Sequence, residues 1–404
     1  MSAIITRASQ RVAPLALIAA VSAFSMHVHA APPANAYQVT NLVSDVNAIS
    51  APNHDPNLKN AWGIVFNPTG PVWVADNRTG LSTLYDGAGA PQSLVVKIPS
   101  ANGTDVASPT GIVFNGSSNF VVKNAAGVSS ASVFIFASQD GVISGWSPSV
   151  DPTHAVTGAL NSAAIYKGLA LAGNGDGLFL YAADFKGRKI DVYDATFTPV
   201  TTSGGFVDPQ IPSDFSPFNI QNIEGNLYVA YAQRDPASNV QVVGAGLGFV
   251  DVFDADGNLL QQLVMRGHLN APWGMALAPN GFGALSNSLL VANFGDGTIN
   301  AYDPHTGNFN GELRDASGQP VMIDRLWGIT FGNGVDKQPT DTLFFTAGPN
   351  NYADGLYGRI DVATPQGNGN SNGNSNGNGN SNGNSSDNSS SSVNSNANDD
   401  GSES

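Results

Sequence analysis

Hydrophobic and polar positions alternate along this chain in short runs, and one such run recurs. In this run a glycine follows a residue of variable size and precedes mainly apolar residues. It occupies residues 61–66, 109–114, 272–277 and 326–331. Each copy is followed by a turn rich in Gly, Pro or Asn and by a second apolar run. One small strand-forming unit repeated along a chain is typical of a propeller or solenoid. The pattern therefore predicts an all-β repeat protein.

The first unit contains enough alternating segments for four strands. We expect strands at residues 63–66, 72–76, 82–86 and 94–98, separated by turns. The third-strand pattern recurs later, at residues 189–194, 249–254, 298–303 and 358–362. Side chains in a strand alternate between its two faces, so each of these strands has one face available to pack on a neighbouring sheet. Each unit is predicted to be one four-stranded blade.

The spacing of the repeated glycines gives the number of units. Gly63, Gly111, Gly168, Gly274 and Gly328 are separated by 48, 57, 106 and 54 residues. The longest interval is about twice the others, and a degenerate copy at residues 218–230 fills it. The chain is therefore predicted to form a six-bladed β-propeller.

The two ends of the repeat region supply a check on this count. The sixth unit has strand patterns at residues 327–331, 343–346 and 356–362 but no fourth strand. Residues 37–43 alternate like a strand and belong to no unit. We expect the N-terminal strand to complete the last blade, because this pairing closes the ring and removes exposed strand edges.

The first thirty residues have the composition of a signal peptide. Arg7 and Arg11 precede the apolar run 15–24, and Val28-His29-Ala30 offers small residues at a cleavage site. The run is shorter than the ~20 residues of a membrane-spanning helix, and no later run is longer. We expect cleavage near Ala30, a secreted or periplasmic protein, and no transmembrane anchor. The chain has no cysteine, so disulfides do not stabilise it.

Composition also divides the chain and limits its partners. Residues 366–404 consist mainly of Asn, Gly and Ser and have almost no apolar surface to bury, which predicts a disordered tail. The expected organisation is thus a signal peptide at 1–30, a propeller at 31–365 and the tail at 366–404. A net charge of −15 disfavours nucleic acid as a partner. Nothing in the sequence calls for a dimer, and we expect a monomer.

At this level of detail the repeat resembles a known one. Trp62-Gly63, the strand ending Val74-Ala75-Asp76 and the following Tyr85-Asp86-Gly87 are similar to the NHL repeat. The spread of Trp-Gly units behind a signal peptide resembles an uncharacterised family of secreted bacterial NHL-like propellers. The resemblance spans residues 37–365 and implies the propeller architecture, but it implies no activity.

The predicted topology brings two sets of loops to one face, around the central channel. These are the loops that enter each inner strand and the loops that join the second strand to the third. Lys167 and Asn219 lie at entry points of their own units. The ligand-binding residues predicted on this face are Asn60, Trp62, Arg78, Lys186, Asn270, Trp273, Asn293, Arg325, Trp327 and Asn350. An alternative interpretation is that the tryptophans only wedge between blades.

A metal site is a separate hypothesis for the same face. Asp76, Asn77 and Asp184 follow second strands and offer oxygen ligands of the kind that calcium prefers. The alternative is structural, because Asp at the end of a strand commonly accepts hydrogen bonds from the following turn. The same structural interpretation applies to Asp residues before later turns, namely Asp86, Asp194, Asp254 and Asp303.

Two classes of function follow from these residues. The first is a binding or scaffold module whose Trp- and Asn-rich channel mouth engages a glycan, a peptide or an envelope protein. The alternative is a divalent-cation-dependent hydrolase or lyase acting on an ester, lactone or glycoside. Glutamate occurs only at Glu224, Glu312 and Glu403, and none of these begins an inner strand. The absence of a Glu ligand at an inner strand and of a paired acid and base favours the binding module.

Overall fold

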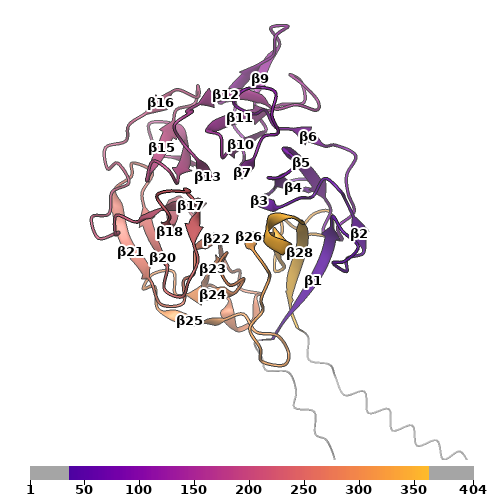
Figure 1. Cartoon of the computed structure of the whole chain (residues 1–404), viewed down its shortest axis with the longest axis vertical. Coiled ribbons are helices and arrows are strands. Elements are labelled where there is room, and N and C mark those ends of the chain that lie inside the picture. The colour runs from indigo at the N-terminus through magenta and orange to yellow at the C-terminus, as the bar shows by residue number, and fades with distance from the viewer. Residues whose placement is uncertain (1–35, 364–404) are drawn as a thin grey trace, which may run out of the picture. The chain divides into compact units, whose positions relative to one another are not determined.

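The computed structural model describes residues 36–363, which form six sheets arranged radially around one axis (Figure 1). The predicted signal peptide and tail lie outside the described residues, so export stays a prediction. The six-bladed propeller is confirmed. Within the described part of the chain, no helix has the length and apolar character needed to span a membrane.

The blades follow one another along the chain, and we number them from the first complete one. Blade 1 comprises β3 (Ala61–Phe66), β4 (Val72–Asp76), β5 (Leu81–Tyr85) and β6 (Val96–Lys97). Blade 2 comprises β7 (Pro109–Phe114), β10 (Phe134–Ser138), β11 (Val142–Trp146) and β12 (Val156–Leu160). Between its first two strands a hairpin is inserted, made of β8 (Val121–Lys123) and β9 (Ser129–Ala131). The repeat pattern did not predict this hairpin.

The next three blades have the same order. Blade 3 comprises β13 (Tyr166–Gly173), β14 (Leu178–Asp184), β15 (Lys189–Tyr193) and β16 (Pro199–Val200). Blade 4 comprises β17 (Phe215–Ile223), β18 (Asn226–Arg234), β20 (Gly248–Phe253) and β21 (Leu259–Met265), with β19 (Gln241–Val242) paired to the end of β18. Blade 5 comprises β22 (Pro272–Leu277), β23 (Leu289–Asn293), β24 (Ile299–Tyr302) and β25 (Phe309–Glu312), with the short helix η1 (Gly283–Leu285) between its first two strands.

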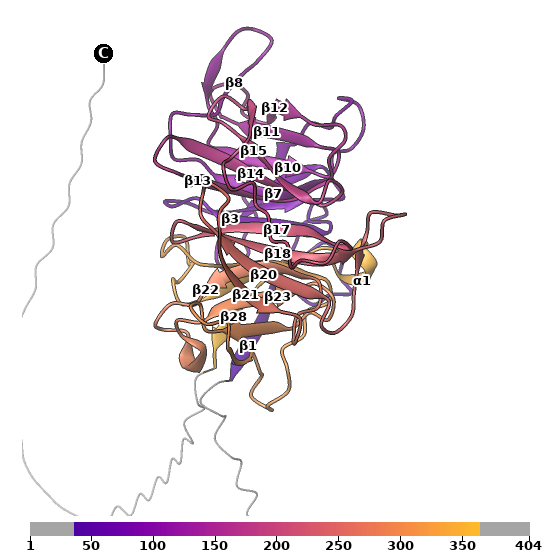
Figure 2. The same ribbon diagram turned by 90° about the vertical axis from the view of Figure 1, so that its left-hand side faces the viewer.

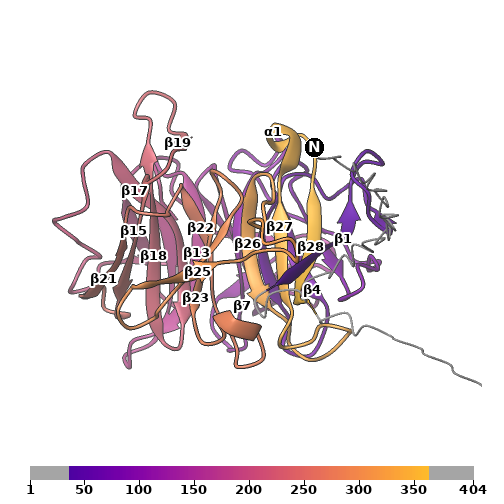
Figure 3. The same ribbon diagram turned by 90° about the horizontal axis from the view of Figure 1, so that it is seen from below.

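The sixth blade joins the two ends of the described chain, as the sequence predicts. It comprises β26 (Leu326–Phe331), β27 (Leu343–Ala347), β28 (Leu356–Val362), β1 (Tyr37–Ser44) and β2 (Asn53–His54). β1 runs antiparallel to β28, from the pair Tyr37 and Val362 to the pair Ser44 and Leu356. The two strands lie side by side in both face-on and edge-on views (Figures 1 and 3). The ring is therefore held closed by a pairing between residues more than 300 positions apart.

Every inner strand has a β-bulge near its start, and in five of the six blades the bulge includes the repeated glycine. In blade 1, Ala61 pairs with Asp76 and Ile64 pairs with Val74, so Trp62 and Gly63 together oppose one residue. A shift of this kind recurs near the start of the other five inner strands. A bulge bends the strand and re-aims a side chain. The residues re-aimed here, one per blade, are Trp62, Thr110, Lys167, Phe218, Trp273 and Trp327; we call them the bulge residues.

The glycine after each bulge residue allows neighbouring inner strands to approach closely. A Cβ atom built on Gly274 would lie 2.5 Å from the Trp327 carbonyl oxygen, and one on Gly111 would lie 2.5 Å from the Leu169 nitrogen. Such distances are shorter than van der Waals contact, so a side chain at these positions would push two blades apart. The ring of inner strands therefore depends on glycine at the repeated position.

Blade 4 lacks this glycine and uses Asn219 instead. The Asn219 side chain is buried and its Nδ2 donates a hydrogen bond to the Trp273 carbonyl oxygen, 2.8 Å away, in the next blade. It also fills the space beside Gly168 in the preceding blade. In the degenerate unit, the Asn219 side chain thus contacts both neighbouring blades, and its hydrogen bond to Trp273 links blade 4 to blade 5.

Aspartates at the outer turns have a structural role, as predicted. Asp86, Asp194, Asp254 and Asp303 each accept hydrogen bonds from backbone N–H groups two to four residues further on. These side chains replace backbone partners that the turn does not provide. They stabilise the outer edges of the blades and lie outside the channel mouth.

The glycine contact predicts a specific stability difference. Gly274→Ala should lower the unfolding free energy by about 1–3 kcal/mol, because overpacking between two blades forces the backbone to shift. Gly177→Ala is the matched control, since its Cβ would meet only the Phe179 ring at 3.5 Å. Thermal and denaturant unfolding of both variants test this, and equal stability of the two would contradict the role given to the inner glycines.

Candidate functional site

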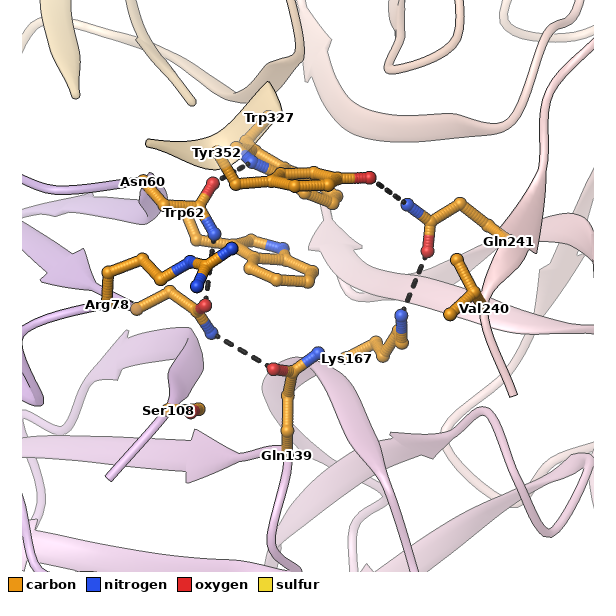
Figure 4. A pocket seen from close by; sticks show the side chains of 11 residues that line it. Asn60, Trp62, Arg78, Ser108, Gln139, Lys167, Val240, Gln241, Trp327 and Tyr352 are labelled. Atoms are coloured by element: carbon orange, nitrogen blue, oxygen red, sulfur yellow. Dashed lines mark hydrogen bonds between the residues drawn. The ribbon is translucent and has the colours of Figure 1, made fainter. Parts of the chain in front are cut away.

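A pocket of about 240 Å³ opens at one mouth of the central channel (Figure 4). The face that carries it also carries α1 (Pro349–Tyr352) and the loop with β19, which project on the same side of the disc (Figures 2 and 3). The pocket is lined by Asn60, Trp62, Asn77, Arg78, Ser108, Gln139, Lys167, Val240, Gln241, Trp327 and Tyr352.

The blades contribute side chains of different size to the channel mouth. Blade 2 has the small Thr110 as its bulge residue, and the Thr110 hydroxyl is held by the carbonyl oxygens of Ala137 and Tyr166. The residue after the second strand is polar in blades 1 and 2, where it is Asn77 and Gln139. In blades 3 and 5 the equivalent residues are aromatic. Asn77 and Gln139 therefore line the pocket, whereas Phe185 and Phe294 fill the equivalent positions of blades 3 and 5.

These two rings belong to an aromatic cluster, which we call the aromatic plug: Trp62, Phe185, Phe218, Trp273, Phe294 and Trp327. Trp62 stacks on Trp327 with ring centroids 3.7 Å apart, and Trp327 stacks on Phe294 at 4.2 Å. All six side chains are buried. The three tryptophans contact one another, so their rings fill the interior of the channel mouth.

A chain of hydrogen bonds connects the plug to the polar side of the pocket. The Trp327 Nε1 donates to the Asn60 Oδ1 at 2.9 Å, and the Asn60 Nδ2 donates to the Asn77 Oδ1 at 3.0 Å. The Asn77 Nδ2 in turn donates to the Pro109 carbonyl oxygen at 3.1 Å and lies 3.4 Å from the Gln139 Oε1. Asn60 has a positive φ of 48°, a conformation that asparagine tolerates well. These carboxamides are fixed in place before any ligand arrives.

Lys167 closes the pocket on the side of blade 3. Its Nζ donates to the Gln241 Oε1 at 3.0 Å and lies over the Phe185, Phe218 and Trp62 rings, with the nearest centroid at 4.8 Å. The side chain is buried, and within residues 36–363 no carboxylate forms an ion pair with it. Burial away from any compensating charge lowers the pKa of Lys167 to about 7.

Neighbouring residues fix the position of this amine. The Trp273 Nε1 donates to the Lys167 carbonyl oxygen at 2.9 Å, which holds the backbone of the bulge. On the far side, the Gln241 Nε2 donates to the Tyr352 hydroxyl at 3.2 Å, so Gln241 bridges the amine and the phenol. Figure 4 shows the side chains of Lys167, Gln241 and Tyr352 along one wall of the pocket.

Tyr352 is held by an unusual backbone segment. Asn350, Asn351 and Tyr352 have φ values of 54°, 54° and 69°, so α1 contains consecutive left-handed residues. A non-glycine residue in this region costs roughly 1–2 kcal/mol. The Tyr352 ring stacks parallel to Phe294, and the Arg325 guanidinium lies 5.0 Å from the Tyr352 ring centroid. Strained backbone of this kind is found most often at functional sites.

The charge lining the pocket is opposite to that of the whole chain. Its lining includes the exposed Arg78 and the buried Lys167 but no Asp or Glu, although the chain carries a net charge of −15. In addition, the Trp62 Nε1 is buried and has no hydrogen-bond partner among the described residues. An unpaired buried donor costs roughly 1–3 kcal/mol, so a ligand acceptor that reaches it would be stabilised. The pocket therefore favours an oxygen-rich, negatively charged group.

The structure brings together part of the predicted ligand-binding set. Asn60, Trp62, Arg78 and Trp327 line the pocket. Trp273 lies in the plug beneath it. Asn270 and Asn293 are buried and bonded within blade 5, through the Asp296 carboxylate and the His268 carbonyl oxygen respectively. The remaining predicted residues, Lys186, Arg325 and Asn350, do not line the pocket.

The metal candidates are not gathered at one point. Asp76 and Asp184 belong to blades 1 and 3, which blade 2 separates. Asp184 accepts backbone hydrogen bonds from Ile165 and Gly187, as its structural interpretation predicts. Burial raises the pKa of Asp76 well above its usual range, which favours the neutral carboxyl group, a poor calcium ligand. Residues 36–363 contain no group of three or more His, Asp or Glu side chains placed to hold a metal. The calcium hypothesis stays a prediction.

Six lining residues were missing from the predicted ligand-binding and metal sets: Ser108, Gln139, Lys167, Val240, Gln241 and Tyr352. Lys167 had a visible signal, because it precedes Gly168 where other units have tryptophan. Ser108 lies in the loop that enters the first strand of blade 2, and Gln139 lies in the loop between its second and third strands. Both loops are of the two kinds predicted to reach this face. Val240, Gln241 and Tyr352 lie in a longer loop and a left-handed turn, and no periodic pattern marks these segments.

The relatives found among known proteins have no assigned activity. No model of a protein family matches the chain. Uncharacterized protein R648 of Acanthamoeba polyphaga mimivirus is 36% identical over 340 residues, covering 80% of this chain and 80% of that protein. Uncharacterized protein L690 of the same virus is 34% identical over 339 residues, covering 80% and 85%. The viral source of these relatives gives no support to the bacterial and secreted part of the resemblance noted above.

Solved structures similar to this chain are also propellers. A glucose dehydrogenase superposes with a TM-score of 0.50 at 12% identity, covering 81% of this chain and 99% of that one. A virginiamycin B lyase from Staphylococcus aureus gives a TM-score of 0.45 at 12% identity, covering 81% and 99%. The glucose dehydrogenase superposition shows a shared fold and, at this identity, carries no argument about chemistry.

The environment of Lys167 predicts a pH-dependent stability difference. The folded-state pKa of about 7 is below the unfolded value of about 10.4, so the folded protein binds fewer protons between these values. Relative to Lys167→Met, the wild type should gain about 1.4 kcal/mol of unfolding free energy for each pH unit from 7 to 10. Denaturant unfolding of both proteins at several pH values tests this. A difference that does not change with pH would contradict the buried, unpaired amine.

Proposed function

We propose, from the premise that this chain belongs to the family of the mimivirus proteins R648 and L690, that it is a binding module for small organic anions. The relatives carry no assigned activity, so the proposal comes from the channel-mouth pocket. The observation that carries it is the lining itself, which contains two basic side chains, four carboxamides and no carboxylate.

Each part of the pocket suits one part of such a ligand. The Arg78 guanidinium can form two parallel hydrogen bonds with a carboxylate, the geometry in which arginine binds anions most strongly. The carboxamides of Asn60, Asn77 and Gln139 are already oriented by their own hydrogen bonds. Because this arrangement is held by the ring of blades, little side-chain entropy is lost on binding.

The size of the pocket limits the ligand. Pockets for drug-sized molecules are roughly 300–1,000 Å³, so about 240 Å³ fits a small acid or one terminal unit of a larger molecule. Of the glycan, peptide and envelope partners that the sequence predicts, the pocket therefore favours those that present a small acidic group. A long neutral polymer would leave the Arg78 guanidinium without an anionic partner.

A matched panel of ligands tests this function. Benzoate, pyruvate and glucuronate should bind and change the intrinsic tryptophan fluorescence, whereas benzamide and glucose should bind weakly or not at all. Arg78→Gln should weaken binding of the acids by roughly 10- to 100-fold, the value of a hydrogen bond to a charged group.

Arg314→Gln is the control for net charge. Arg314 pairs with Glu312 at 2.9 Å and does not line the pocket, so its replacement should leave binding unchanged. Neutral analogues that bind as tightly as the acids, or an Arg78→Gln variant with wild-type affinity, would contradict the proposal.

A further inference from the structure

Lys167 is the exception among the bulge residues. Of the six, four are aromatic and one, Thr110, is bonded to backbone within the ring. Lys167 takes the position that tryptophan occupies in blades 1, 5 and 6, yet it ends at the pocket surface. Placing an amine among aromatic rings is costly, and an apolar residue would pack there without that cost. The position therefore calls for a role that packing does not explain.

The contacts of Lys167 suit chemistry at its nitrogen. Its Nζ has one hydrogen-bonding side chain, Gln241, and no carboxylate within the described residues that would hold it as an ammonium ion. The amine lines the pocket, so a bound molecule can reach it. Burial without a counter-ion disfavours the ammonium ion and so favours the neutral, nucleophilic form of lysine.

We propose that Lys167 condenses reversibly with the carbonyl group of a small aldehyde or ketone bound in the channel-mouth pocket, forming an imine. The Nζ lone pair adds to the carbonyl carbon, giving a carbinolamine. The carbonyl oxygen then leaves as water, taking up two protons, while both amine protons are lost and a C=N bond forms. Water in the reverse direction releases the ligand and restores the amine. The step needs no oxidant, reductant or co-reactant.

The wall beside Lys167 can assist the proton transfers. The Gln241 Oε1 accepts a hydrogen bond from the amine, which orients the nitrogen and its single lone pair. The Tyr352 hydroxyl accepts from the Gln241 Nε2, so its own proton is free to be donated to an oxygen in the pocket. Burial raises the pKa of Tyr352, which keeps the phenol protonated. Tyr352 is thus placed to protonate the departing oxygen, with Gln241 as the positioning residue.

The class of ligand follows from combining this amine with the anion site. A molecule that carries a carboxylate next to a carbonyl group, a 2-oxo acid, would use Arg78 for the acid and Lys167 for the ketone. This choice of ligand rests on the proposed function, because both use the same pocket. Imine formation itself does not require Arg78, so the two proposals can fail separately.

Reductive trapping tests the imine directly. The full-length protein is incubated with pyruvate and sodium borohydride, which converts an imine to a stable secondary amine, and the modified lysine is located by peptide mass spectrometry. Labelling at Lys167 should exceed labelling at the exposed Lys186 by on the order of a hundredfold at neutral pH, because burial without a counter-ion favours the neutral amine of Lys167. Labelling spread equally over exposed lysines, or absent from Lys167, would overturn the proposal.

Two variants serve as controls for this experiment. Lys167→Met removes the amine and retains an apolar side chain, and it should lose the specific label while keeping the fold, checked by thermal unfolding. Lys186→Met removes an exposed lysine at the turn between β14 and β15 and should leave labelling of Lys167 unchanged. Specific labelling that persists in Lys167→Met would assign the chemistry to another residue and overturn the proposal.

Acetaldehyde separates this inference from the proposed function. It has a carbonyl group but no carboxylate, so it should label Lys167 equally in wild type and in Arg78→Gln. Pyruvate should label Arg78→Gln less than wild type. Trapping by acetaldehyde with no Arg78 dependence for pyruvate supports the imine and contradicts the anion site. Pyruvate binding that depends on Arg78, without trapping by either compound, supports the anion site and overturns the imine.

Gln241→Glu tests the role of the local environment through a pH profile. The new carboxylate would lie beside the Lys167 Nζ, 3.0 Å away in the wild type, and would stabilise the ammonium form. The trapping rate should then fall at neutral pH and recover at higher pH, while Gln241→Met should not shift the profile in this direction. A profile in Gln241→Glu that is identical to the wild type would contradict a neutral reactive amine at this position.

Discussion

The close approach of the six inner strands is the constraint on which this structure depends. At five of the six positions a glycine lets one blade touch the backbone of the next, and at the sixth Asn219 spans the gap with a hydrogen bond to Trp273. Because the chain has no cysteine, these contacts and the pairing of β1 with β28 must hold the ring. The same glycines lie within the bulges. The feature that lets the blades close into a ring therefore also points the bulge residues toward the channel mouth.

The site is a direct consequence of this arrangement. Each bulge aims one side chain at the channel mouth, and the identity of that side chain decides whether the mouth is filled or open. Tryptophan and phenylalanine form the plug, while Asn77 and Gln139 line the pocket. Lys167 lies at the boundary, where aromatic rings remove water from its amine and the pocket leaves it accessible. Rigidity of the ring keeps the amine in this environment, since movement toward solvent would disturb the plug.

Much of the architecture could be predicted from sequence because it is periodic. Repeated glycines gave the number of blades, and the unpaired segment 37–43 identified the closing strand. The tryptophans of blades 1, 5 and 6 lie together in the plug, but their burial could not be judged from sequence, because Phe218 and Phe294 from other blades pack against Trp327. Asn270 and Asn293 look like Asn60 in sequence, yet in blade 5 their side chains are bonded to Asp296 and to the His268 backbone. Gln241 and Tyr352 reach the pocket through loop conformations that no repeat encodes.

The claim that everything else rests on is that the ring of blades holds Lys167 as a buried, unpaired amine at the channel mouth. Titration of the lysine side chains by heteronuclear NMR, with the Lys167 resonance assigned from its loss in Lys167→Met, measures this without any ligand. The account predicts a pKa of about 7 for Lys167, well below the value of about 10.4 for a lysine in an unfolded chain. A Lys167 resonance that titrates together with the exposed lysines would contradict the account.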